Sequence, residues 1–366
     1  MNRYDSIVIG AGPAGCAAAY DLAAAGQRVL LFDRRRFPRT KPCAGGITIK
    51  TMRRLRYTIE PVIQRSCNEV VVGRRLEATT RFHGRRPVCV MTVRAEFDDY
   101  CLQRTIQRGA HFAVIPHIHG ITQDRDGVTV ETSAGSFRAG HLVGADGANS
   151  VVRRLVPGFA AMDHGFAIEA RVSADSPPPM EFDFGVAEFG YGWLFPKRDH
   201  INVGLYTNAP DVPLNREALE QYARAKLGAV RLEHVVGHRI GLHGWNRQIA
   251  SDRVLLAGDA AGLVDPLLGE GIHNAVASGQ AAAEAIRSAS EAGAEPATAY
   301  RRALGPMLHD LREAYRAATR FYRHVGIGYR VLTTAIVRTA LMKAYARGLT
   351  FSAAKRQFLL LPFTSG

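Results

Sequence analysis

Residues 4–33 read YDSIVIGAGPAGCAAAYDLAAAGQRVLLFD, and this stretch decides the fold. The apolar runs 4–10 and 28–33 predict two buried parallel strands, and the Ala-rich run 13–26 between them predicts a helix that ends at Gly26. A strand, a crossover helix and a second strand form a β-α-β unit, which requires a parallel sheet. The sequence therefore predicts an α/β protein with a Rossmann-like domain.

The turn after the first strand reads GAGPAG at 10–15, which matches G-x-G-x-x-G. Gly10 allows the tight turn, Gly12 lets the backbone approach a pyrophosphate, and Gly15 allows helix and strand to pack closely. The helix N-terminus offers unpaired N–H groups to the phosphates. Asp33, at the end of the second strand, is placed to accept hydrogen bonds from ribose hydroxyls. The motif predicts dinucleotide binding but leaves FAD and NAD open.

A second glycine-rich stretch, GDAAGLVDPLLGEGIHN at 258–274, lies between a predicted strand and a predicted helix. Asp259, next to Gly258 at the strand end, can bind the ribityl hydroxyls of a flavin. The helix that follows Gly269 and Gly271 can stabilise negative charge near a reduced isoalloxazine ring. Contacts so far apart in the sequence fit a cofactor longer than a mononucleotide, which favours FAD over NAD.

Two shorter stretches carry further polar groups. Asp146 lies in GADG at 144–147, directly after another apolar strand. Arg94 opens a helix predicted over 94–109, where its cation can meet ribityl or phosphate oxygens. Taken alone, the Ala-Asp-Gly sequence is more often only a turn, and Arg94 is more often a surface residue.

The remaining pattern predicts a second lobe and a helical C-terminus. Short strand-like runs over 69–92 and a strand-rich region from about residue 160 to 248 indicate an inserted antiparallel β-sheet. We therefore expect a discontinuous FAD-binding domain over 1–65, 93–160 and 249–292, a β-sheet substrate domain over 66–92 and 161–248, and a C-terminal helical segment over 293–366.

Basic residues outnumber acidic ones, with 47 Lys and Arg against 33 Asp and Glu and a net charge of +14. Such an excess suggests an anionic partner such as nucleic acid, a membrane surface or a phosphorylated substrate, with a solvated basic surface as an equal alternative. The chain has neither a nucleic-acid-binding signature nor an interleaved basic and aromatic tract. We therefore predict no nucleic-acid partner.

The cysteines and the lengths of the apolar runs indicate where in the cell the protein is expected. The cysteines are odd in number and lack a C-x-x-C pair, so we predict neither a disulfide framework nor a metal site. They are Cys16, Cys43, Cys67, Cys89 and Cys101. The N-terminus has a strand pattern rather than that of a signal peptide, and no run of about 18 apolar residues predicts a spanning helix. A cytoplasmic location is the default expectation.

The C-terminal segment combines basic and aromatic residues, and apolar stretches follow at 331–337 and 358–363. These residues are Arg301, Arg302, Arg312, Tyr315, Arg316, Arg320, Phe321, Tyr322 and Arg323. A basic amphipathic helix can lie on an anionic bilayer, so peripheral contact with the inner face of a membrane is one of two open interpretations. A helical cap packed on the FAD lobe is the alternative. The sequence does not indicate an oligomeric state.

Taken together, the glycine fingerprint, the Arg94 helix, the Ala-Asp-Gly strand end and the Gly-Asp segment resemble, in the same order, the FAD-dependent class that includes p-hydroxybenzoate hydroxylase. The resemblance covers most of residues 1–285. CAGG at 43–46 and YGWLFP at 191–196 narrow it, because they look like the C-x-G-G and Y-x-W-x-F-P motifs of the geranylgeranyl reductase family. This resemblance implies saturation of isolated double bonds in the prenyl chains of archaeal lipids, chlorophyll side chains or isoprenoid quinones.

The same resemblance implies a role for each matching residue. Cys43 would border the flavin on its substrate side, with Gly45 and Gly46 leaving room for the chain. Tyr191, Trp193 and Phe195 would line a hydrophobic tunnel, which suits a chain without hydrogen-bonding groups. Tyr206 and His200 match no motif. The expected FAD contacts are Gly10, Gly12, Pro13, Ala14, Gly15, Asp33, Arg34, Cys43, Ala44, Gly45, Arg94, Asp146, Gly258, Asp259, Pro266, Gly269, Gly271 and Ile272.

The implied reaction needs a proton donor. An isolated alkene is a poor hydride acceptor, so protonation of one carbon must accompany hydride delivery to the other. Cys43 and Tyr191 are the candidate donors, and the place of Cys43 in C-x-G-G favours it. Because no second G-x-G-x-x-G exists for a nicotinamide, the electron donor stays open between NADPH bound transiently and a reduced ferredoxin-like protein, which a basic face could dock.

Two other functions fit parts of the same pattern. A flavin monooxygenase that hydroxylates an aromatic or polyketide-like compound needs the same FAD site. A non-catalytic prenyl-binding protein on this fold is opposed by the intact Asp33 and Gly258-Asp259. The 191–196 stretch also overlaps the W-x-W-x-I-P signature of flavin-dependent halogenases, but Tyr191 replaces the first Trp and Phe195 replaces the Ile.

Overall fold

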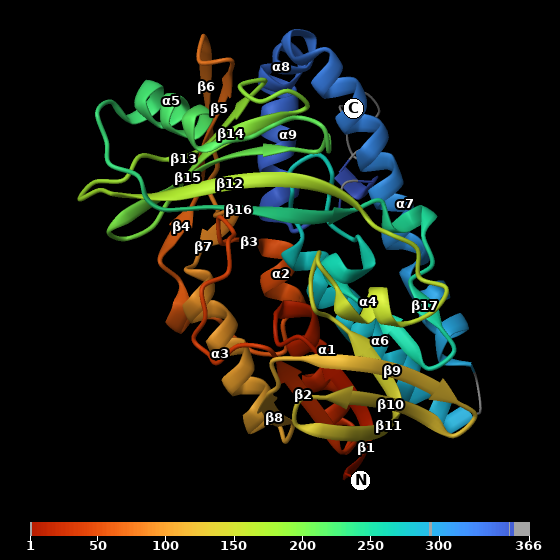
Figure 1. Cartoon of the computed structure of the whole chain (residues 1–366). Helices are drawn as coiled ribbons and strands as arrows, with labels where there is room; N and C mark the ends of the chain where they lie inside the picture. The colour runs from red at the N-terminus through yellow and green to blue at the C-terminus, as the bar shows by residue number, and fades with distance from the viewer. Residues whose placement is uncertain (1, 293–294, 351, 355–366) are drawn as a thin grey trace.

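The N-terminal β-α-β unit forms where the hydrophobic pattern places it. β1 (Asn2–Ile9) pairs in parallel with β2 (Val29–Asp33), and α1 (Pro13–Ala24) crosses between them. Three more parallel strands complete the order β18-β11-β1-β2-β8: β8 (His111–Val114), β11 (Gly135–Gly144) and β18 (Val254–Leu256). The computed structural model describes residues 2–292, 295–350 and 352–354 of the chain. Figure 1 shows this sheet in the lower lobe of the molecule.

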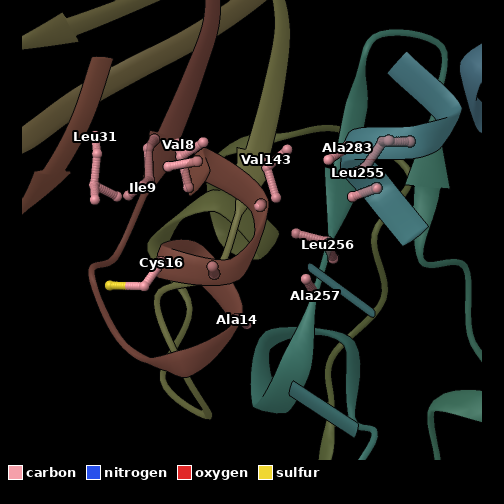
Figure 2. Close-up of a cluster of buried hydrophobic side chains, with 14 of the residues drawn as sticks. Val8, Ile9, Ala14, Cys16, Leu31, Val143, Leu255, Leu256, Ala257 and Ala283 are labelled. Atoms are coloured by element: carbon pink, nitrogen blue, oxygen red, sulfur yellow. The ribbon is translucent and has the colours of Figure 1, made fainter. Parts of the chain in front are cut away.

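This parallel sheet is buried on both faces, which explains its almost unbroken apolar strands. Val8, Leu31 and Val143 come from three adjacent strands and are each fully buried in one cluster. Figure 2 shows them beside Cys16 of α1. Burying one side chain of this size stabilises the fold by about 1.5–3 kcal/mol.

Two helices pack backbone to backbone under this sheet. A Cβ atom added to Gly279 of α6 (Ile272–Ala292) would lie only 2.1 Å from the carbonyl oxygen of Ala14 in α1. A Cβ on Gly258 would lie 3.2 Å from the Ala14 side chain. This contact brings the 258–271 segment against the 10–15 turn, although some 250 residues separate them in the chain.

The glycines of the first turn differ in what surrounds them. A Cβ on Gly10 would meet the Ala145 carbonyl oxygen at 2.5 Å, and one on Gly15 would meet the Gly10 carbonyl oxygen at 1.8 Å. A Cβ on Gly12 would meet only the Arg39 side chain, at 3.7 Å. Gly10 and Gly15 are therefore required by backbone packing, whereas Gly12 leaves open space beside the helix N-terminus.

A seven-stranded sheet, antiparallel except at the β13–β5 pair, forms the second lobe in the order β16-β12-β15-β14-β13-β5-β6. Its strands are β5 (Glu69–Arg74), β6 (Ala78–His83), β12 (Asp163–Ser173), β13 (Met180–Phe184), β14 (Gly190–Pro196), β15 (His200–Thr207) and β16 (Glu233–Leu242). With this sheet beside the parallel one, the predicted fold class is confirmed. The lobe boundaries stay a prediction.

One helix in this lobe was not expected from the strand-rich pattern. α5 (Arg216–Leu227) covers one face of the sheet, where Leu219 and Tyr222 join the cluster around Leu194 and Val203. Its sequence signal was the N-cap Asn215, whose side chain accepts from the Ala218 N–H over 2.9 Å. Tertiary burial of an amphipathic stretch, rather than strand periodicity, explains this segment.

Smaller elements connect the lobes. β3 (Gly46–Thr48), β7 (Cys89–Met91) and β4 (Arg65–Cys67) form a three-stranded sheet, and β3 begins at the last glycine of C-x-G-G. The remaining small elements are α2 (Ile49–Arg54), η1 (Glu60–Val62), α3 (Arg94–Gln107), α4 (Val151–Leu155), η2 (Gly244–Asn246) and η3 (Gly258–Ala261). Three antiparallel strands extend the sheet of the first lobe: β10 (Gly127–Thr132) pairs with β11, β9 (Ile118–Asp124) pairs with β10, and β17 (Ala250–Ser251) pairs with β18.

The C-terminal helices span both lobes. α7 (Pro296–Arg323) starts on the parallel sheet, where the Tyr300 hydroxyl donates to the Leu256 carbonyl over 2.6 Å. It then rises to α8 (Val325–Thr333), and α9 (Ala335–Ala346) returns beside the second sheet (Figure 1). No helix in the ranges that the structure describes is long and apolar enough to cross a bilayer. The predicted apolar stretch 358–363 lies outside the described residues.

Replacing Gly15 with Ala should lower the free energy of unfolding in urea by about 1–3 kcal/mol, because the methyl group overlaps a backbone carbonyl that has no room to move. Gly12→Ala is the matched control. It should lower the stability of the FAD-free protein less, by about 0.5–1 kcal/mol, because alanine is a poorer N-cap than glycine. It should also weaken FAD binding, since its methyl group enters the open space. Equal losses of stability in both variants would contradict this division of roles.

Candidate functional site

The carboxyl ends of β1 and β2 hold the glycine turn against Asp33. The Ala11 N–H donates to Asp33 Oδ2 over 3.0 Å, which fixes this buried carboxylate beside the turn. Pro13 is the first residue of α1, and Ala14 is buried. Arg34 is exposed next to Asp33. The residues expected at the adenosine end are thus brought together.

Two arginines and two acids form a buried cluster next to this turn. Arg39 lies 3.6 Å from Asp33 Oδ2 through Nε and 3.2 Å from Asp98 Oδ2 through Nη1. Arg94 makes a bidentate pair with Asp98 at 2.8 and 2.9 Å. Burial acts to lower the pKa of Arg94, but Asp98 raises it, so Arg94 is charged. Arg94 is only 8% exposed, which rules out a surface residue.

Arg39 was missed by the sequence reading. It is the basic residue nearest to the open side of Gly12, where the α1 N-terminus favours an anion. Its only sequence signal was its place in a run of arginines that follows Asp33, and such a run is more often solvated. We count Arg39 as a candidate phosphate contact.

Asp146 uses its carboxylate within its own segment. Asp146 accepts from the Ser150 hydroxyl at 2.6 Å and from the Val151 N–H at 2.6 Å, at the start of α4. Its Cα would lie 2.8 Å from a Cβ on Gly10, so its backbone borders the glycine turn. A contact of Asp146 with FAD stays a prediction, and the backbone is the part that faces the turn.

The second glycine-rich segment supplies a free carboxylate. Within the described residues Asp259 is half-buried and makes no side-chain hydrogen bond, and its Oδ1 would lie 3.5 Å from a Cβ on Gly271 at the start of α6. Glu270 pairs with Lys50 at 2.7 Å and accepts from the His273 N–H at 2.9 Å. An unpaired acid beside a helix N-terminus suits ribityl hydroxyls and a flavin ring.

These features fit the two ends of FAD. The open side of Gly12 and the fixed Asp33 suit a pyrophosphate and a ribose, and the free Asp259 carboxylate suits a ribityl chain. The packing of α1 on α6 places both ends on one continuous surface. Bound there, FAD would supply hydride chemistry.

Three tyrosines hold the segment that leads into α6. The hydroxyl of Tyr191 donates to the Leu268 carbonyl over 2.5 Å, and that of Tyr206 to the Pro266 carbonyl over 3.2 Å. The Tyr322 hydroxyl donates to the Leu267 carbonyl between them. Since these tyrosines come from β14, β15 and α7, the second lobe and the C-terminal helices both position the flavin end of the site.

The aromatic residues of β14 share one face, because they alternate along the strand. Ring centroids are 6.1 Å apart for Tyr191 and Trp193 and 6.4 Å apart for Trp193 and Phe195. Phe182 of β13 extends the face, 5.2 Å from Phe195. A Cβ on Gly46 would lie 3.1 Å from the Phe195 ring. The two motifs of the predicted prenyl site therefore meet in space.

The C-x-G-G loop is held through its backbone by two buried charged residues. The Cys43 N–H donates to Glu169 Oε1 over 2.9 Å, and Lys197 Nζ donates to the Ala44 carbonyl over 2.6 Å. Glu169 comes from β12, and Lys197 directly follows β14. Cys43 is half-buried, whereas the other four free thiols are buried.

Lys197 and Glu169 were also missed by the sequence reading. Burial lowers the pKa of Lys197 to about 8, and Lys197 makes no ion pair among the described residues. Burial raises the pKa of Glu169, whose Oε2 has no hydrogen-bond partner within those residues. Charged residues kept in such surroundings are typical of functional sites. Their sequence signal was a single acid within the apolar run 166–170 of β12 and a lysine directly after the apolar β14.

Comparisons with known proteins agree on the cofactor domain. Residues 3–305 match the family model of the FAD binding domain. The geranylgeranyl diphosphate reductase of Rhodobacter capsulatus is 32% identical over 311 residues, which cover 80% of this chain and 77% of that protein. An uncharacterized protein of Methanosarcina barkeri is 34% identical over 357 residues, which cover 96% of this chain and 92% of that protein.

Solved structures show the same fold. A geranylgeranyl bacteriochlorophyll reductase-like protein from Thermoplasma acidophilum superposes with a TM-score of 0.74 and 20% identity, covering 100% of this chain and 98% of that one. The flavin-dependent brominase Bmp2 gives a TM-score of 0.77 and 18% identity over 99% of both chains. At these identities the likeness concerns the fold alone.

Replacing Lys197 with Met should leave the protein as stable at pH 7 or stabilise it by about 1–4 kcal/mol, because a buried cation without a counter-ion is removed. The folded wild type releases this proton near pH 8 and the unfolded chain near 10.5. Raising the pH across that window therefore stabilises the wild type relative to Lys197→Met. Urea unfolding at pH 7, 9 and 10.5 measures this.

The same variant should expose Cys43, since Met does not bond to the Ala44 carbonyl. Iodoacetamide should then alkylate Cys43 severalfold faster than in the wild type, whereas Lys343→Met, which removes an exposed lysine, should change neither the alkylation rate nor the stability. Unchanged alkylation in Lys197→Met would show that Lys197 does not hold the loop.

Proposed function

Since the chain belongs to the geranylgeranyl reductase family of FAD-dependent oxidoreductases, we propose that it saturates isolated C=C bonds in the prenyl chain of a geranylgeranyl-type lipid or an isoprenoid quinone. One observation carries the proposal. The aromatic face of β14 meets the C-x-G-G loop where Gly46 contacts Phe195, beside the segment that leads into α6. The reductase names of relatives at about 30% identity support the same substrate class.

The residues of the chain divide the work as follows. When bound, reduced FAD supplies the hydride for one alkene carbon. Tyr191, Trp193 and Phe195 form an apolar wall that orients the chain and excludes water. A proton delivered to the second carbon completes the addition of two hydrogens across the double bond.

Cys43 is the proton donor that we propose. Its thiol is the only half-buried one of the five, and its loop is fixed by Glu169 and Lys197. The other candidate, Tyr191, already donates its hydroxyl proton to the Leu268 carbonyl, and burial raises the pKa of that hydroxyl. We therefore assign Tyr191 to positioning the segment before α6 and to lining the substrate.

The source of electrons and the location belong to the same proposal. The sequence holds a single G-x-G-x-x-G, so it offers no second dinucleotide motif for a nicotinamide cofactor. The flavin would therefore be reduced by NADPH bound transiently or by a reduced ferredoxin-like protein. A cytoplasmic enzyme that contacts the inner face of a membrane through its basic C-terminal helices suits a lipid substrate.

A flavin monooxygenase acting on an aromatic or polyketide-like compound is the second candidate. It needs the same FAD site, and the likeness in fold to a flavin-dependent brominase does not choose between the two reactions. A non-catalytic prenyl-binding protein has less support, because the chain matches an FAD binding domain and keeps Asp33 beside the glycine turn.

The deciding experiment starts from the purified protein, reduced anaerobically with dithionite. Added geranylgeranyl diphosphate, or a menaquinol whose ring is already reduced, should reoxidise the flavin without O₂, and the prenyl chain of the product should gain two hydrogens per event by mass spectrometry. Reoxidation by O₂ alone, with an oxygenated product or peroxide, would instead establish the monooxygenase. A purified protein without flavin absorbance would favour the non-catalytic binder.

Cys43→Ser should slow anaerobic reoxidation by prenyl substrate by about 10²–10⁴-fold, the usual contribution of a positioned proton donor. FAD affinity and the melting temperature should stay near the wild-type values. Cys67→Ser makes the same change at a buried thiol of the small sheet and should keep the wild-type rate. A Cys43→Ser enzyme with full kcat would remove Cys43 from the chemistry.

A further inference from the structure

The end of the molecule formed by α8, the start of α9 and the β5–β6 turn exposes large apolar side chains. Exposed fractions are 65% for Ile327, 55% for Val331, 70% for Ile336 and 47% for Leu76. These are four of the eight exposed large hydrophobic side chains in the described ranges. We call these four residues the α8 surface.

The elements that carry the four residues reach one end of the molecule (Figure 1). Ile327 and Val331 are four positions apart on α8 and therefore share a face, opposite the buried Tyr329. The β5–β6 turn lies next to α8, because the Arg74 guanidinium lies 5.8 Å from the centre of the Tyr329 ring. In Figure 1 this turn and α8 reach the same end of the molecule. Exposed large apolar side chains gathered at one end of a molecule are typical of interaction sites.

The chain segment that carries α8 and α9 is strongly basic, whereas Glu77 of the β5–β6 turn pairs with Arg74. Residues 314–350 hold seven Arg and Lys residues and no Asp or Glu. The seven are Arg316, Arg320, Arg323, Arg330, Arg338, Lys343 and Arg347. Arg320, Arg323 and Arg330 are exposed beside the apolar residues. An apolar patch with a cationic rim matches the acyl region and the headgroups of an anionic bilayer.

We infer that the α8 surface docks on an anionic lipid bilayer, with Ile327, Val331 and Ile336 inserted below the headgroups and the arginines on the phosphates. The described helices are too short or too polar to span a bilayer, so the contact lies in the interface. An acidic protein would pair with the arginines but would not account for the isoleucines. The bilayer accounts for both the charge and the apolar exposure.

The α8 surface also lies close to the aromatic site. A Cβ on Gly328 of α8 would lie 2.5 Å from the Phe321 ring, which packs 4.9 Å from Phe184 between ring centroids. Phe184 in turn lies 5.7 Å from Tyr191. Docking would therefore hold the aromatic face near the acyl chains. This consequence rests on the proposed function, whereas the docking itself does not.

Co-sedimentation with vesicles tests the inference without turnover. The full chain should bind vesicles of phosphatidylcholine with phosphatidylglycerol, bind pure phosphatidylcholine much more weakly, and lose affinity as salt rises. Replacing both Ile327 and Ile336 with Glu should lower the partition coefficient at least about tenfold, because insertion is lost. Both side chains are more than half exposed, so the fold should survive.

Ile106→Glu is the matched control, since it changes an exposed isoleucine of α3, in the lobe of the parallel sheet. It should bind vesicles like the wild type. Equal binding by the double variant and the wild type would overturn the inference, and so would binding to an acidic ferredoxin-like protein without binding to vesicles. If vesicles bind but prenyl substrates do not reoxidise the flavin, the proposed function fails while the docking stands. If prenyl substrates reoxidise the flavin but vesicles do not bind, the docking fails while the proposed function stands.

Discussion

The contact between α1 and α6 is the constraint on which the rest of the site depends. At Gly279 the two helices approach so closely that any Cβ would overlap the Ala14 carbonyl. Only this approach lets Gly258 lie on α1, and with it Asp259 beside the N-terminus of α6. A cofactor with two polar ends then meets one surface, although its contacts come from both ends of the chain. Small residues on both helices are the physical cause, because larger side chains would separate them.

The second lobe positions the site by two different means. Three tyrosine hydroxyls bond to consecutive carbonyls of residues 266–268. A buried carboxylate and a buried ammonium bond to the backbone of the C-x-G-G loop. Backbone groups held in this way keep their position without a salt bridge across the site. The charges at Glu169 and Lys197 oppose stability, since burial disfavours both charged forms. Because this loss of stability occurs at the loop that carries the half-buried Cys43 thiol, it suggests that Glu169 and Lys197 have a functional role.

Membership of the family establishes the class of enzyme, whereas the substrate is inferred from the site. An FAD-dependent oxidoreductase follows from the matched domain and from relatives above 30% identity. The fold alone does not select the reaction, because reductase-like and brominase structures superpose about equally well. The choice of a prenyl chain depends on the aromatic face and the C-x-G-G loop, because the Tyr191 hydroxyl and the Trp193 N–H already bond within the protein.

The sequence by itself determined the β-α-β unit, the glycine turn, Asp33 and the two family motifs. These features depend only on hydrophobic periodicity and backbone conformation within short stretches of the chain. It missed α5, Arg39, Glu169 and Lys197, and it left Tyr206 unassigned. It also assigned Asp146 a contact with FAD that stays a prediction, and it did not show that this carboxylate accepts from the Val151 N–H at the start of α4. Only the tertiary structure decided these points, because each depends on a partner far away in the chain or on burial. A lone lysine or tyrosine in a strand acquires its role from the carbonyl that folding places opposite it.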